Sequence, residues 1–159
     1  MIRDITLLAV ALVFCGDPAF SQPLTPTASA DNLGPIVVQI AQDLLDLGEQ
    51  HASRIENCEM DRIVMNVEET GRLAVDTLEI AYSMIRIYAL VSAPNDRVRV
   101  GRYLEGSLTN YRQRLDLQLK RLNKVLGASL IPAAVAVIGT RTKDNIRAAL
   151  GILERTTLP

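Results

Sequence analysis

The strongest constraint on the fold of this chain is an apolar seam that runs from Met60 to Val91. Its residues recur in steps of four and three, the heptad spacing of an α-helix that packs against other helices. They are Met60, Val64, Val67, Gly71, Ala74, Leu78, Ala81, Ile85 and Tyr88. A second row, of Ile80, Met84, Ile87 and Val91, widens the apolar face in its last third. Because a helix buries such a stripe only against partners, the seam predicts a helix covered by further helices.

Three further segments carry the same spacing, and none shows the alternation or turn dipeptides of a β-hairpin. We expect helices to begin near Asn32–Pro35, at Asn95 or Asp96 as capping residue after Pro94, and near Ser129–Pro132. Gly127 is placed to end the second of these helices, and Gly139 is a point where the last one could break. Their seams are Val37, Ala41, Leu44, Gly48, His51, Ile55 and Cys58; Leu104, Leu108, Tyr111, Leu115, Leu119, Leu122 and Leu126; and Ile131, Val135, Ile138, Thr142, Ile146, Ala149 and Leu153.

The junction between the first two helices has two interpretations. Residues 53–56 match a capping box that would start a new helix, and the seam slips phase between Cys58 and Val64. We therefore prefer a turn near 57–60, although no Gly or Pro interrupts residues 56–61. The predicted fold is all-α: an antiparallel bundle of about four helices with 60–91 and 96–126 as its central hairpin. The alternative is a long helical hairpin with one continuous helix over 35–92.

The N-terminus has the features of a secretory signal. Arg3 precedes an apolar stretch from Ile5 to Phe14, and Ala19-Phe20-Ser21 supplies small residues where a signal peptidase reads them. We expect residues 1–21 to be removed by cleavage before Gln22, which places the protein in the periplasm or outside the cell. The alternative is a lipoprotein anchored at Cys15, although the bulky Phe14 before it is unfavourable for lipid attachment.

The mature chain has the length of one domain. Residues 22–33 are rich in Pro, Thr, Ser and Ala without periodicity, and they are predicted to form a flexible leader before a single bundle domain at 34–156. Cleavage would leave Cys58 as the one cysteine, so that no intramolecular disulfide could form.

Charge is distributed unevenly along the chain. Of 17 Lys and Arg and 18 Asp and Glu, cleavage would remove one base and two acids, which leaves no net charge. Residues 31–69 hold nine acids and two bases, whereas residues 93–126 hold three acids and eight bases. The simplest prediction is that the acidic first helix and the basic third helix pack as neighbours.

Few residues could carry catalysis. His51 is the only histidine, and no phosphate loop, Gly-x-Ser-x-Gly elbow, haem motif or paired Glu-x-x-His motif occurs. His51 and Cys58 share one face of the expected first helix, but two turns separate them by about 10.5 Å, too far to bind one small ion. We expect no enzyme activity and no cofactor; Cys58 stays a candidate for redox chemistry or an intermolecular disulfide if it is exposed.

Two charged segments and one apolar segment could contact partners. The acidic residues Glu56, Glu59, Asp61, Glu68 and Glu69 are typical of a solvated helix face, and no EF-hand loop surrounds them. Leu130–Ile138 is either the buried start of the last helix or a docking patch. Basic residues along the third segment suit anionic lipid headgroups or an acidic partner rather than nucleic acid, since the mature chain has no Phe or Trp for base stacking. The candidates we single out there are Arg112, Lys120, Arg121 and Lys124.

These features favour an exported, non-catalytic interaction or scaffold module. Its partner would be an unknown protein or a second copy, with contact to a membrane surface also possible. The alternative function is a binding or sensor bundle that holds a small apolar ligand between its helices. That function would require a cavity lined by residues such as Val64, Leu78 and Leu108.

Overall fold

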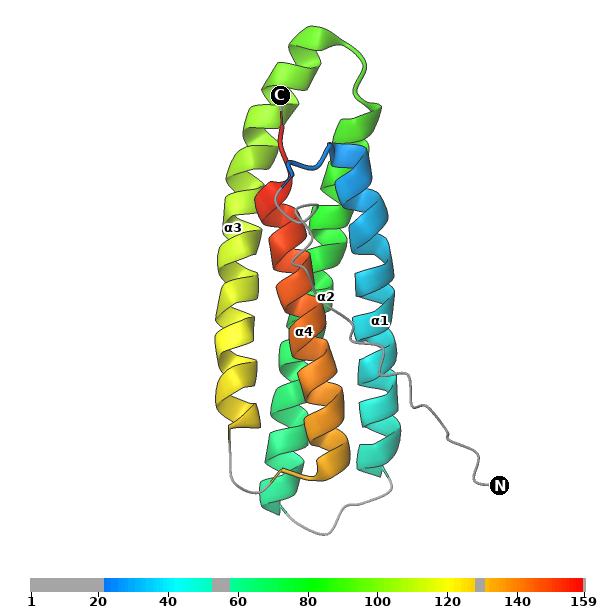
Figure 1. Cartoon of the computed structure of the whole chain (residues 1–159), viewed down its shortest axis with the longest axis vertical. Coiled ribbons are helices and arrows are strands. Elements are labelled where there is room, and N and C mark those ends of the chain that lie inside the picture. The colour runs from blue at the N-terminus through cyan, green and yellow to red at the C-terminus, as the bar shows by residue number, and fades with distance from the viewer. Residues whose placement is uncertain (1–21, 53–57, 128–130, 159) are drawn as a thin grey trace, which may run out of the picture.

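The computed structural model describes residues 22–52, 58–127 and 131–158, and the side chains of residues 50–52 and 58–60 lie outside this description. Four helices are present: α1 (Pro26–Ala52), α2 (Cys58–Leu90), α3 (Pro94–Leu126) and α4 (Ala133–Arg155). Each runs antiparallel to the next, and α4 returns to pack against α1 (Figure 1). The described residues form no strand, so the predicted all-α bundle of about four helices is confirmed.

The long seam of α2 is the best-predicted part of the fold. Every seam residue from Val64 to Tyr88 is buried, and Tyr88 is among the largest side chains with no exposed surface. Leu104, Leu108, Leu115 and Leu122 of α3 and Val135, Ile138, Ile146, Ala149 and Leu153 of α4 complete the same core. The core is therefore aliphatic, as the heptad spacing predicts.

The first helix begins earlier than predicted. α1 starts at Pro26, with the Thr25 hydroxyl accepting a hydrogen bond from the Ala28 backbone N–H at 3.3 Å, so most of the expected leader 22–33 is helical. Pro35, expected in the first turn, lies inside the helix. Burial of Ala30 and Leu33 in the core stabilises the extra turns despite the N–H that Pro35 lacks.

The first two helices are separate, so the alternative of one continuous helix over 35–92 is wrong. α1 ends at Ala52 and α2 begins at Cys58, slightly before the turn we preferred. The predicted seam of α1 is also out of phase: Leu33, Ile40 and Leu47 are buried, whereas Val37, Ala41, Leu44 and Gly48 are half-buried. α1 packs against two helices, α2 and α4, so the row with Leu33 and the row with Val37 are both at least partly covered.

The remaining helices begin and end near the predicted residues, but not always with the predicted capping groups. The N-cap of α3 is Ala93, without a side-chain hydrogen bond, so Asn95 and Asp96 lie in its first turn and do not cap it. Gly127 is the C-cap of α3, with right-handed backbone angles (φ −85°, ψ −1°). Gly139 does not break α4, and a Cβ built on it would lie 2.7 Å from Leu126 Cδ2, which shows how closely α3 and α4 approach.

The acidic and basic helices are not neighbours. α1 packs against α2 and α4, and α3 packs against the same two helices, so α1 and α3 lie diagonally opposite (Figure 1). The predicted pairing of α1 with α3 is therefore wrong. In an up-and-down bundle with short connections, chain order decides which helices touch, and weak surface ion pairs do not override it.

The two ends of the described chain are joined to each other. Leu24 forms an isolated parallel bridge with Thr156: its N–H donates to Arg155 O at 2.8 Å, and the Thr157 N–H donates to its carbonyl oxygen at 3.1 Å. The buried Thr156 hydroxyl hydrogen-bonds the Ser29 hydroxyl at 2.8 Å and Ile152 O at 2.9 Å. The segment before α1 and the end of α4 are thus fixed together beside the α2–α3 connection (Figure 1).

Candidate functional site

The outer face of α2 and α3 carries apolar side chains that the core does not use. On α2, the second row is not buried as predicted: Ile80 is 47% exposed and Ile87 is 61% exposed, while Met84 is half-buried. On α3, Tyr103 is 70% exposed, and Val100 and Tyr111 are half-buried. We name these residues the α2–α3 strip: Ile80, Met84, Ile87, Val100, Tyr103 and Tyr111.

One contact fixes the two halves of the strip side by side. The Tyr111 hydroxyl donates to the Met84 sulfur at 3.2 Å, across the α2–α3 interface. Ile80 and Ile87 lie one turn before and after Met84, so helical spacing puts them on the same side of α2. Tyr103 lies two turns closer to the α2–α3 connection than Tyr111, so it extends the exposed surface of α3 toward that end of the bundle. The strip is thus one surface made by two helices.

Farther from the α2–α3 connection than the strip, charged residues line a hollow between the same helices. Its volume is about 470 Å³, and it is bordered by three basic residues and Glu69. The basic residues are Arg62, Arg121 and Lys124. Two of the four predicted basic candidates, Arg121 and Lys124, therefore lie together, next to the α2–α3 strip.

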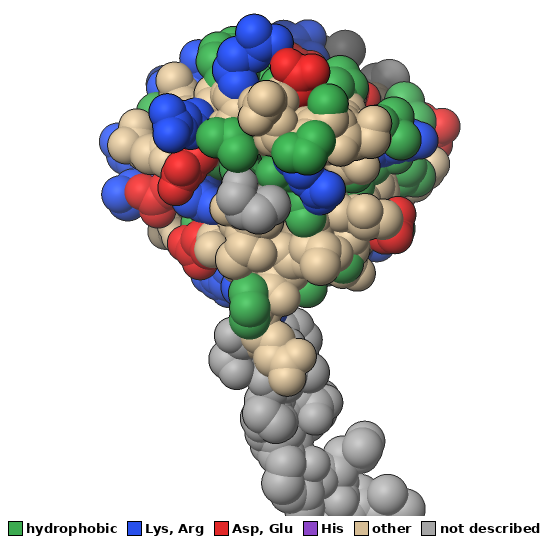
Figure 2. Space-filling model, turned by 90° about the horizontal axis from the view of Figure 1, so that it is seen from above, with side chains coloured by type: hydrophobic (Ala, Val, Ile, Leu, Met, Phe, Trp, Pro, Cys, Tyr) green, Lys and Arg blue, Asp and Glu red, His purple; other side chains and the backbone are tan. Residues whose placement is uncertain are grey.

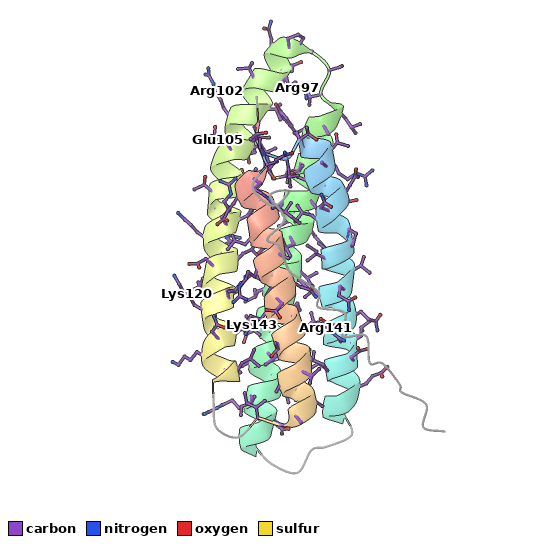
Figure 3. All side chains as sticks on the ribbon, in the orientation of Figure 1. Arg97, Arg102, Glu105, Lys120, Arg141 and Lys143 are labelled. Atoms are coloured by element: carbon purple, nitrogen blue, oxygen red, sulfur yellow. The ribbon has the colours of Figure 1, made fainter. Side chains whose placement is uncertain are left out.

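The other two predicted basic candidates have partners within the bundle. The Arg112 guanidinium is half-buried and donates to Leu153 O, with Nε at 3.0 Å, so it satisfies a carbonyl near the end of α4. Lys120 pairs with Asp116 at 2.6 Å along the exposed side of α3. Lys120 and Arg102 project away from the bundle in Figure 3. These four residues do not form one basic site.

His51 and Cys58 do not share one helix face. His51 belongs to the last turn of α1 and Cys58 is the first residue of α2, because α1 ends at Ala52. Their side chains, and those of Glu56 and Glu59, lie outside the described residues. Within the described part of the chain, no three His, Cys, Asp or Glu side chains are grouped to hold a metal ion.

A buried charge that the sequence did not reveal joins α1 to α4. Asp43 is fully buried, and its Oδ1 lies 2.5 Å from Arg141 Nη2 and 3.1 Å from Gln39 Nε2. Arg141 also reaches Asp46 at 3.4 Å, and Figure 3 shows it directed from α4 toward α1. The hydrogen bond and the negative charge of Asp43 raise the pKa of the Arg141 guanidinium. The nearest signal in the sequence is the position of Asp43 between Ile40 and Leu47, at helical spacing from both.

A second hollow lies on the α1–α4 side, near the joined chain ends. It encloses about 780 Å³, and its apolar lining comes from Leu24, Ile36 and Ile152. Asn32, Arg147 and Arg155 are polar groups at its border. Val64, Leu78 and Leu108, which we expected to line a ligand cavity, are instead buried in the core and line none of the hollows described here.

The end of the bundle at the α2–α3 connection presents basic, acidic and apolar side chains side by side (Figure 2). Arg97 lies over the Tyr88 ring, with its guanidinium carbon 5.5 Å from the ring centre. No helix among the described residues is both long enough and apolar enough to cross a membrane.

No protein-family model, curated protein or solved structure matches this chain.

Proposed function

We propose that this chain is an exported, non-catalytic helical-bundle protein that acts by binding a protein partner through the α2–α3 strip. The observation that supports the proposal is the second apolar row of α2. It has the spacing of a helix-packing seam, yet Ile80 and Ile87 face outward beside the exposed Tyr103. Exposed apolar rows on an otherwise polar surface are characteristic of interaction sites, and Tyr is among the residues that contribute most to binding.

Export is the second part of the proposal, and it follows from the N-terminal sequence. Cleavage before Gln22 would leave only two residues ahead of Leu24, which is hydrogen-bonded to the end of α4. Mass spectrometry of the protein recovered from the exporting cell tests this, with Gln22 expected as the first residue. A mass increase removed by Cys15→Ser would instead indicate the lipoprotein.

The binding proposal is tested by photocrosslinking in the exporting cell. A photoreactive amino acid at Ile87 should yield a discrete adduct, whereas the same amino acid at Val38 should not. Val38 is a matched control because it is 69% exposed on α1, away from the strip. An adduct with lipid would indicate a membrane surface instead of a protein. Recovery of uncrosslinked protein from both positions would contradict the proposal.

The second candidate function, binding of a small apolar ligand, is favoured by the hollow between α1 and α4. Its lining by Leu24, Ile36 and Ile152 offers an apolar surface, with Arg147 and Arg155 at the border to orient a polar group. Gly151→Leu should fill it, because a Cβ at Gly151 meets no atom within 4 Å. Loss of fluorescence from a bound apolar dye in this variant, but not in Gly106→Leu, would support ligand binding.

A further inference from the structure

We infer that the partner of the α2–α3 strip is a second copy of this chain, related to the first by a two-fold axis that runs parallel to the helices. The inference rests on the proposed binding role of this face and names its occupant. Two observations carry it: the exposed apolar strip on both helices, and a charge pattern beside it that is complementary to itself.

The charge pattern consists of one acidic and one basic column. Glu69 and Asp76 lie seven residues apart on α2, and both are exposed; Arg62, seven residues before Glu69, ends this acidic column. Arg114 and Arg121 lie seven residues apart on α3, and both are exposed. In the described part of the chain, no ion pair joins the two columns, and Arg114 is hydrogen-bonded only to Asn110, at 3.0 Å.

The columns stand at matching heights. Glu69 and Arg121 border the same hollow, so they lie at one level of the α2–α3 interface. Asp76 and Arg114 each lie two turns closer to the α2–α3 connection, so they share a second level. At each of the two levels, the acidic residue of α2 and the basic residue of α3 therefore have the same height along the bundle and opposite charges.

Rotation about a two-fold axis parallel to the helices keeps each residue at the same height along the bundle and brings α2 opposite α3. It places α2 of each copy on α3 of the other, with the two helices antiparallel. Glu69 and Asp76 then face Arg121 and Arg114 of the second copy. Ile87 and Tyr103 also share a level, because each lies five turns closer to the α2–α3 connection than Glu69 and Arg121. The same patch contacts itself, which is the usual geometry of a homodimer.

Sedimentation velocity of the purified chain, over a wide range of concentrations, tests the inference. The unaltered chain should form a dimer. Ile87→Asp should raise the dissociation constant of the dimer at least about tenfold, because it puts a charge into the apolar part of the interface. Val38→Asp, an equally exposed apolar position on α1, should leave it unchanged. Circular dichroism should show the same helix content in all three proteins.

A charge exchange identifies the second copy as the partner. Asp76→Arg alone should weaken the dimer because it places two guanidinium groups together, and adding Arg114→Asp should restore most of the loss. A chain that stays monomeric at every concentration would overturn the inference, as would a dimer that Ile87→Asp weakens no more than Val38→Asp. If the chain is monomeric but Ile87 still crosslinks to a different protein, the proposed binding function stands and only the dimer is wrong.

Discussion

At the α1–α4 interface a fully buried carboxylate, Asp43, meets Arg141, whereas at the α2–α3 interface the contact between polar side-chain atoms joins the Tyr111 hydroxyl to the Met84 sulfur. The first interface also carries the Leu24–Thr156 bridge and the buried Ser29–Thr156 hydrogen bond. The second is bordered by exposed Ile80 and Ile87. One interface is closed by specific polar contacts, whereas the half of the other nearest the α2–α3 connection is apolar and extends to the surface.

The difference follows from how each pair of helices is connected. Only residues 91–93 separate α2 from α3, so the short connection fixes which residues face each other. α1 and α4 are separated by two whole helices, and an aliphatic seam with a seven-residue repeat would allow them to slip past each other. The ion pair of the buried Asp43 with Arg141 penalises such a slip, since a displaced Asp43 would be buried without a partner. Polar contacts therefore specify the register where the chain connection cannot.

The largest expected effect tests that role of Arg141. Arg141→Met should lower the free energy of unfolding more than any other change proposed below, because Asp43 stays buried without its cation; the 45% exposure of Arg141 keeps the loss below that of a fully buried pair. Urea unfolding followed by circular dichroism measures the change. The double variant Asp43→Leu with Arg141→Met should recover most of it. If the single and double variants unfold alike, the pair does not act as described.

Since the pKa of Arg141 is raised, its charged form is favoured in the folded state. Its stabilising effect is therefore fully present below the ordinary pKa of arginine and is lost only as the pH rises through the strongly alkaline range.

The next effect concerns the joined chain ends. Thr156→Val should cost about 1–2 kcal/mol, because it leaves the buried Ser29 hydroxyl without its partner. Thr157→Val is the matched control: Thr157 is exposed, and its hydroxyl bond to Leu24 O at 3.2 Å should contribute little. Thermal unfolding of both variants separates the two outcomes. Equal losses would mean that the backbone bridge, and not the buried hydroxyl pair, holds the ends together.

Two glycines compare close helix packing with open surface. Gly106→Ala on α3 should raise stability by about 1 kcal/mol, because no atom lies within 4 Å of the added methyl group and Ala is the better helix former. Gly71→Ala on α2 should gain less or lose stability, since its Cβ would lie 2.5 Å from Leu44 Cδ2 of α1 and force that side chain to shift. The difference between their urea midpoints measures how tightly α1 and α2 approach. A larger gain for Gly71→Ala would contradict the packing described here.

The smallest expected effect lies at the α2–α3 interface. Tyr111→Phe removes the hydroxyl bond to the Met84 sulfur but keeps the ring, and we expect a loss of about 0.5 kcal/mol or less. Guanidinium unfolding, compared with the effect of Arg141→Met, gives the ratio between the two interfaces. A loss as large as that of Arg141→Met would show that α2 and α3 also depend on polar specification.

Heptad spacing predicted most of the core of α2, α3 and α4, although Tyr111, Leu119, Leu126 and Ile131 are only half-buried. The buried faces of α2, α3 and α4 follow the expected seams; on α2 the second row, with Ile80 and Ile87, stays outside the core. The prediction failed for α1, where two rows compete and where Thr25 and Pro26 supplied a start signal as good as Asn32 to Pro35. Of the predicted site residues, Arg121 and Lys124 lie together, Arg112 binds a helix end, and Lys120 pairs locally.

What the sequence determined by itself is the class of fold and the identity of most core residues, because both depend on local periodicity. The tertiary structure decided which helices are neighbours, and thereby that the acidic α1 faces Arg141 of α4 and not the basic α3. It also decided that the second row of α2 faces outward. A helix in a four-helix bundle has two neighbours and one free side, and the spacing of an apolar row does not state which of these it will meet.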